Sequence, residues 1–176
     1  MTFSDMTLHQ TPIREAAEAD MPEIAALNVA SWRSAYADLL PADYLGEPVE
    51  RFLAARFGAL PQTGFILLHG GPGDLQGFLY VEPGGGNRGG LDLPVGFVRA
   101  FHVRPDLKGR GIGRALFGAA CARLSAGGGH GLWLEVAEEN HDARAAYAAL
   151  GGVDGGPFED EIDGMPVIAR RIVWRW

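Results

Sequence analysis

The sequence predicts an α/β (α+β) protein with a mixed, twisted sheet of six or seven strands flanked by about four helices. Short apolar runs bounded by glycine and proline alternate along the chain with stretches of helical apolar spacing. Two neighbouring runs joined by a glycine-rich turn indicate an antiparallel hairpin, whereas two later runs joined by a helix indicate a parallel pair. Both strand directions in one chain predict a mixed sheet.

Length and composition limit the class of protein. The 176 residues fit a single domain, 1–176, and 47% hydrophobic side chains suffice for one core. Residues 1–11 show no periodicity and are expected to form a loose tail. Because Cys121 is the only cysteine, the chain holds no internal disulfide.

Charge and apolar run length limit the partners. The 15 basic and 22 acidic side chains give a net charge of −7, which opposes binding to nucleic acid. No apolar run approaches the ~20 residues that span a bilayer, and residues 1–10 lack the features of a signal peptide. We therefore expect a cytoplasmic protein with no nucleic-acid or membrane partner, and a homodimer is left open.

The first third of the chain predicts one strand and two helices. Pro12, Ile13 and Arg14 open the strand. Asp20 is expected to cap the first helix, with Glu23 closing a capping box, and this helix fades near Tyr36. The second helix is predicted by apolar residues at three- and four-residue spacing: Val49, Phe52, Leu53 and Phe57.

The middle of the chain predicts three strands. Phe65–His69 and Phe78–Val81 flank a glycine-rich turn and form the hairpin. Pro83–Pro94 is rich in glycine without periodicity, so we expect a mobile surface loop. Val95–Val103 is the third strand candidate.

The last third predicts two helices, each followed by a strand. The first has one apolar face and stops at Gly127, and the second, 140–150, is capped by Asn140. The strands are 132–136 and 167–174, with one further strand left open. The apolar face of the first helix consists of Ile112, Leu116, Ala120 and Leu124.

A glycine-rich turn carries the strand ending at Val103 into the helix that begins near Ile112. Its glycines let backbone amides approach a ligand, and a helix N-terminus offers unpaired N–H groups to phosphate. The P-loop pattern fails because Arg114 and Ala115 follow the last glycine, and the dinucleotide pattern fails because position 114 is not glycine. The turn therefore predicts a polyphosphate site of another kind, with a tight turn that binds nothing as the alternative.

This turn resembles the pyrophosphate-binding turn of the GCN5-related N-acetyltransferase (GNAT) family. The family pattern is Gln or Arg, two residues, Gly, one residue, then Gly or Ala, and Lys108, Gly111 and Gly113 occupy it. The departure is Lys108, which the backbone-based site should tolerate. A second block resembles the family's late strand and helix: Leu134-Glu135-Val136, Asn140, Ala143, Tyr147 and Leu150-Gly151.

The resemblance covers nearly the whole chain and implies an acyl-CoA N-acyltransferase fold that binds acetyl-CoA. Acetyl transfer would be direct, to a primary amine of a small molecule, peptide or protein N-terminus. By position, the acceptor pocket would involve Trp32, Tyr36, Tyr44 and the loop 84–90. Asn140 either bonds the cofactor arm or only caps its helix. The other implied cofactor-binding residues are Phe101, His102, Val103, Lys108, Gly109, Arg110, Gly111, Ile112, Gly113 and Arg114.

The resemblance also implies catalytic roles. Tyr147 stands where many family members carry the general acid, a phenol whose ordinary pKa is near 10. Glu135 precedes it by 12 residues, as in the ribosomal-protein N-acetyltransferase branch, where the matching glutamate takes the amine proton. Glu135 instead points to solvent if strand alternation turns it outward. His102 and a bound water are the other candidates for the base.

Two further alternatives concern function and metal. A non-catalytic module that senses acyl-CoA would use the same turn, but the presence of Tyr147 favours an enzyme. No metal is implied, because the histidines at 9, 69, 130 and 141 lack ligand spacing and Cys121 is isolated. Cys121 lies mid-helix among alanines, where a small core side chain is expected.

Overall fold

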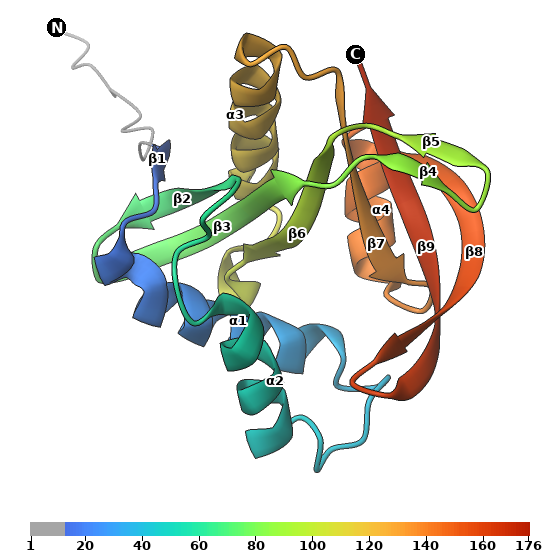
Figure 1. Ribbon diagram of the computed structural model, residues 1–176. Coiled ribbons are helices and arrows are strands. Elements are labelled where there is room, and N and C mark those ends of the chain that lie inside the picture. The colour runs from blue at the N-terminus through green and yellow to red at the C-terminus, as the bar shows by residue number, and fades with distance from the viewer. Residues whose placement is uncertain (1–12) are drawn as a thin grey trace, which may run out of the picture.

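The computed structural model describes residues 13–176, so the tail expected over residues 1–11 lies outside the described part (Figure 1). Within that part, seven strands form one mixed sheet and two short strands form a separate hairpin. The sheet order is β1-β2-β3-β6-β7-β9-β8, with only β6 and β7 parallel. The predicted fold class and the predicted mixture of strand directions are confirmed.

The strands of the sheet are β1 (Ile13–Glu15), β2 (Phe65–Gly71), β3 (Asp74–Pro83), β6 (Gly96–Val103), β7 (Gly131–Ala137), β8 (Val153–Ile162) and β9 (Met165–Arg175). The separate hairpin is β4 (Gly86–Arg88) with β5 (Leu91–Leu93). The helices are α1 (Met21–Ala35), α2 (Glu47–Phe57), α3 (Ile112–Ala126) and α4 (His141–Ala149). No helix between residues 13 and 176 is long and apolar enough to cross a membrane.

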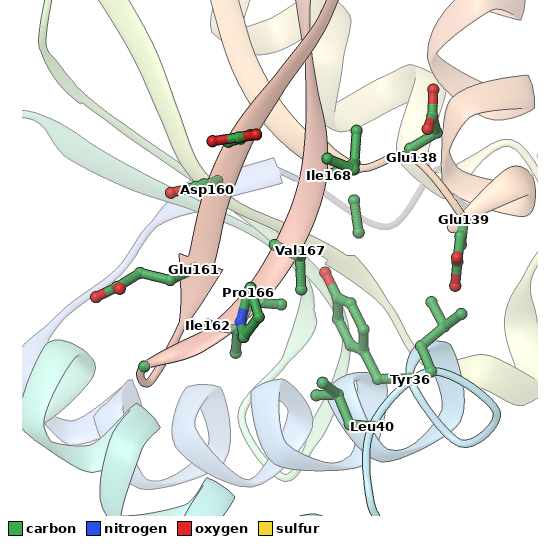
Figure 2. A pocket seen from close by; sticks show the side chains of 14 residues that line it. Tyr36, Leu40, Glu138, Glu139, Asp160, Glu161, Ile162, Pro166, Val167 and Ile168 are labelled. Atoms are coloured by element: carbon green, nitrogen blue, oxygen red, sulfur yellow. The ribbon is translucent and has the colours of Figure 1, made fainter.

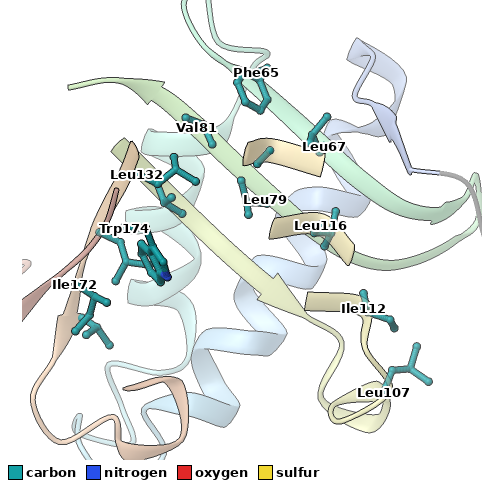
Figure 3. Close-up of a cluster of buried hydrophobic side chains, with 14 residues drawn as sticks. Phe65, Leu67, Leu79, Val81, Leu107, Ile112, Leu116, Leu132, Ile172 and Trp174 are labelled. Carbon is teal, nitrogen blue, oxygen red and sulfur yellow. The ribbon is translucent and has the colours of Figure 1, made fainter. Parts of the chain in front are cut away.

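Strand alternation sends apolar side chains to both faces of the sheet. On one face, α3 and α4 cover a core in which Leu116 meets Leu79 and Leu132 (Figure 3). On the other face, α1 and α2 cover β2, β3 and the part of β6 around Ala100. Ile24 of α1 and Phe78 of β3 are fully buried there. Figure 1 shows α3 above and α1 below this part of the sheet. The predicted helical faces are confirmed, including Ile112, Leu116 and Ala120 as buried residues.

The capping box predicted for the first helix is wrong. Asp20 precedes α1, but its carboxylate makes no hydrogen bond into that helix. It accepts instead from the backbone N–H of Ala17 at 2.8 Å and from both terminal nitrogens of Arg14. The physical reason is a short 3₁₀ turn over residues 18–20, which directs the Asp20 side chain backwards. Arg14 holds the pKa of Asp20 at about 2, so this ion pair joins β1 to the start of α1.

The prediction of a mobile loop over 83–94 is also wrong, because this segment forms the β4–β5 hairpin. Leu93 is buried against Trp133 and Val173, and Leu91 packs against the same cluster. The Trp133 indole N–H donates to the backbone oxygen of Gly84 at 2.7 Å. The hairpin therefore covers β7 and β9 on the face that α1 and α2 leave open.

Strands β6 and β7 pair only at one end. The parallel register joins Gly96 to Leu132 and Phe97 to Trp133 and extends no further. Next to this point β6 carries a bulge, since Val98 and Ala100 oppose consecutive residues of β3. The rings of Phe97 and Trp133 lie 4.4 Å apart and fix the closed end. Beyond them the two strands diverge and leave a gap in the sheet.

Candidate active site

Beside the gap between β6 and β7, side chains of β6 point to both faces of the sheet. Phe101 and Val103 pack with the α3 and α4 side of the core. Between them, His102 points to the opposite face, where its ring lies 5.4 Å from that of Phe78. The strand predicted to hold a cofactor arm therefore offers different chemistry on its two sides.

Tyr147 approaches the gap from α4. Its ring stacks on Phe101 with centroids 6.1 Å apart and meets Trp174 edge-on at 6.0 Å. Burial raises the pKa of the Tyr147 phenol well above its ordinary value, and the neighbouring Tyr36 raises it further. The phenol therefore keeps its proton at neutral pH, as a general acid requires.

Asn140 stands directly before α4 and confirms the predicted helix cap. Its side-chain oxygen accepts from the backbone N–H of Ala143 at 3.2 Å. The rest of its amide acts on Tyr36 through a side-chain hydrogen bond, which opposes the rise that burial causes in the pKa of that phenol. Asn140 thus links Tyr36, at the end of α1, to the start of α4.

His102 is held by α1. Its Nδ1 lies 2.8 Å from the hydroxyl oxygen of the buried Ser31, and the imidazole tautomer decides which atom donates. Burial, together with the charge of Lys108, lowers the pKa of His102 to about 4. The imidazole is consequently neutral at pH 7.

Glu135 projects from β7 to the same face as His102, next to Trp133. Its carboxylate accepts from the Arg171 guanidinium at 3.1 Å. Arg171 also lies over the Phe158 ring, 3.8 Å from its centroid. The half-buried carboxylate therefore has the charged partner that such a position requires. The last β6–β7 pair is Phe97 with Trp133. Glu135 lies two residues beyond it along β7, and His102 lies five residues beyond it along β6, so Glu135 is nearer the closed end of the gap.

The turn before α3 leaves the first amides of the helix without a side-chain partner. Gly111 is the N-cap residue, with φ of 84° and no capping hydrogen bond. A Cβ on Gly77 of β3 would lie 3.0 Å from the His102 oxygen and 3.1 Å from Ile112, so glycine there lets the helix start close to the sheet.

The basic side chains around this turn are exposed. Lys108, Arg110 and Arg114 make no ion pair with any residue between 13 and 176. Free amides, a helix N-terminus and three available cations form an arrangement that suits a pyrophosphate group.

A pocket of about 910 Å³ opens beside the far ends of β7 and α1 (Figure 2). The end of α1, the residues after β7 and the β8–β9 hairpin enclose it. Its lining consists of Tyr36, Leu39, Leu40, Ala137, Glu138, Glu139, Glu159, Asp160, Glu161, Ile162, Gly164, Pro166, Val167 and Ile168.

Carboxylates dominate the polar part of this pocket. Glu138 is neutralised by Arg170, whose guanidinium lies 2.7 Å away. Glu139, Glu159, Asp160 and Glu161 have no ion pair among the described residues. The pocket therefore carries a negative charge that favours a cationic ligand. In residues 13–176 no three His, Cys, Asp or Glu side chains gather in an arrangement that could hold a metal ion.

The pocket differs from the one expected from sequence position. Tyr36 lines it, whereas Trp32 packs beneath Tyr36 with ring centroids 4.6 Å apart. The loop 84–90 belongs to the hairpin over Trp133 and does not line the pocket. Sequence reasoning missed the acidic β8 strand, although the run Glu159-Asp160-Glu161 before the turn at Asp163-Gly164 was a visible signal.

Comparison with known proteins places the chain in a family. Residues 27–151 match the family model described as the acetyltransferase (GNAT) family. The aminoglycoside N(6')-acetyltransferase type 1 of Stenotrophomonas maltophilia is 31% identical over 140 residues, which cover 79% of this chain and 84% of that protein. An uncharacterized N-acetyltransferase of Bacillus subtilis (strain 168), YuaI, is 27% identical over 128 residues, covering 73% and 72% of the two chains.

Solved structures share the fold. A GCN5-related N-acetyltransferase from Rhodopseudomonas palustris superposes with a TM-score of 0.71 at 20% identity, over 98% of this chain and 99% of that one. The PaiA N-acetyltransferase of Thermoplasma acidophilum, solved with coenzyme A, superposes with a TM-score of 0.64 at 15% identity, over 94% and 98%. The architecture is therefore that of acyl-CoA N-acyltransferases, and the chain belongs to the GNAT family of acetyl-CoA-dependent acetyltransferases.

Proposed function

We propose that this enzyme transfers an acetyl group from acetyl-CoA directly to a primary amine of a cationic small molecule, peptide or protein N-terminus. One observation carries the proposal: the β6–β7 gap lies between the uncapped turn before α3 and the acidic pocket at the end of α1. A donor and an acceptor can thus reach the gap from different directions without competing for space.

The residues around the gap fit acetyl-CoA, which supplies the acetyl group as a thioester when bound. The amides of Ile112 and Gly113 would hold the pyrophosphate, with Lys108, Arg110 and Arg114 screening its charge. The backbone of 101–103 would bind the cofactor arm, since this part of β6 has no β7 partner.

The charge of the pocket supports a cationic acceptor. Four carboxylates without ion pairs among the described residues would raise the local concentration of ammonium groups at the pocket. The similarity to an aminoglycoside N(6')-acetyltransferase supports the same class, because an aminoglycoside is a small molecule with several amines. Small polyamines and basic peptides share this chemistry.

The two proton transfers are assigned to opposite faces of the sheet. Tyr147, on the α4 side, would protonate the sulfur as it leaves. Glu135, on the α1 side, would take the proton of the attacking amine, with neutral His102 as the alternative. No covalent intermediate on the enzyme is needed.

Release of CoA thiol across a panel of amines tests the proposed function. Aminoglycosides, polyamines and basic peptides should give higher kcat/KM than neutral monoamines, and added salt should raise the KM of the polycations by screening the pocket. A peptide with a blocked N-terminus and no lysine is the control. CoA release that never exceeds the amine-free blank would contradict the proposal and support a non-catalytic acyl-CoA-binding module.

Gly111→Val is expected to weaken acetyl-CoA binding by at least about tenfold, the value of one hydrogen bond to a charged group. The valine side chain would fill the open space beside Gly111. Calorimetry measures the affinity. Gly128→Val is the matched control, because Gly128 has a similar φ of +81° just beyond the opposite end of α3 and equally open surroundings. Equal acetyl-CoA affinity in both folded variants would rule out this turn as the binding site.

Tyr147→Phe should lower the turnover rate about 100- to 10,000-fold and leave acetyl-CoA affinity unchanged. Phenylalanine keeps the packing on Phe101 and Trp174, so the change removes the proton without opening a cavity. Single-turnover kinetics with an acceptor limited by chemistry is the measurement. Full turnover in this variant would show that Tyr147 is not the acid.

Glu135→Gln should lower kcat/KM and change the low-pH limb of its pH profile, because the limb reports the base. The substitution also weakens the contact with Arg171, so Arg171→Gln is measured beside it as a control that keeps the carboxylate. If Glu135 is the base, Glu135→Gln removes the limb, whereas Arg171→Gln keeps a limb and moves it to higher pH, because the carboxylate loses its cationic partner. If both variants lose rate equally with the limb unchanged, Glu135 is structural and His102 becomes the better candidate.

A further inference from the structure

Tyr36 lines the pocket and also lies near Tyr147 of α4. It caps α1, and its backbone N–H donates to the Trp32 oxygen at 2.9 Å. Its own backbone oxygen accepts from Leu39 and Leu40, both at 3.0 Å. The ring packs on Trp32. These contacts fix the side chain, which Figure 2 shows standing within the pocket with its hydroxyl directed toward Val167.

The Tyr36 phenol lies near Asn140, which directly precedes α4, and near Tyr147 of α4. Asn140 acts on it through a side-chain hydrogen bond, and Tyr147 lies close enough for the charge of Tyr36 to affect its pKa. Because the Asn140 oxygen is used by the Ala143 N–H, its NH₂ group is the end available to the phenol. The phenol oxygen thus accepts from Asn140 and keeps further hydrogen-bonding capacity for a ligand.

We propose that Tyr36 binds the acceptor nitrogen: its phenol oxygen, held by Asn140, accepts a hydrogen bond from the attacking amine and aims the nitrogen toward the gap beside Tyr147. This inference rests on the proposed function and adds a catalytic residue on the acceptor side. Burial raises the pKa of Tyr36, so the phenol stays neutral at neutral pH. It therefore orients the amine, and removal of the amine proton is left to another group.

Tyr36→Phe tests this role because it keeps the ring on Trp32 and deletes only the hydroxyl. We expect kcat/KM for the acceptor to fall about 10- to 100-fold, because the amine loses one hydrogen bond and is oriented less well toward the thioester. The affinity for acetyl-CoA and the slow amine-free hydrolysis of acetyl-CoA should stay as in the parent. Tyr80→Phe is the control, since it deletes a phenol bonded to Glu82 away from the pocket.

Asn140→Asp is the second variant in this test. Aspartate keeps the oxygen that caps α4 but loses the NH₂ group that serves Tyr36. If the two residues act as one unit, the double variant loses no more acceptor kcat/KM than the worse single variant. Additive losses, or a loss of acetyl-CoA affinity in Asn140→Asp alone, would overturn the link.

The outcomes separate this inference from the proposed function. If the parent enzyme acetylates amines and folded Tyr36→Phe does so with equal kcat/KM, the role of Tyr36 is wrong and the function stands. If the parent releases no CoA with any amine, both fail. An equal loss in acceptor-dependent and amine-free rates would show that Tyr36 only supports the fold.

Discussion

Only two residue pairs, Gly96 with Leu132 and Phe97 with Trp133, join β6 to β7 in this sheet. If the ladder continued, the backbone groups of 98–103 on that side would be used inside the sheet and none would remain for a ligand. The bulge beside Val98 turns β6 away, and the packed rings of Phe97 and Trp133 keep the closed end from opening. The positions of the residues proposed around the gap follow from this divergence.

Divergence matters because strand alternation then places neighbouring residues on opposite sides of one opening. Phe101 faces Tyr147 on the α4 side, while His102 faces Ser31 on the α1 side together with Glu135 of β7. In acyl transfer the attacking amine loses a proton and the leaving sulfur gains one, at different positions around the same carbon. A gap reached from both faces would place the proposed acid and the proposed base on opposite sides of the reacting carbon without requiring the sheet to move.

The sequence predicted what depends on local pattern and missed what depends on distant partners. The α3 turn and the Asn140 cap are local, and the structure contains both. The β4–β5 hairpin escaped prediction because Leu93 finds its partners, Trp133 and Val173, much later in the chain. The pocket escaped for the same reason, since its lining comes from the end of α1 and from the β8–β9 hairpin. Asp20 was misassigned because Arg14 competes for its carboxylate.

Burial of Tyr147 sets a condition on how it can act as an acid. Its raised pKa secures the proton but makes the phenolate costly, which by itself would oppose transfer to sulfur. Burial raises the pKa of a thiol in the same way, as it does for Cys121. When phenol and sulfur share the same apolar surroundings the two shifts largely cancel, and the remaining difference is that of ordinary phenols and thiols, about 1.5 pKa units or about 2 kcal/mol. The packing of Tyr147 between Phe101 and Trp174 is therefore compatible with catalysis only if the leaving sulfur is buried beside the same rings.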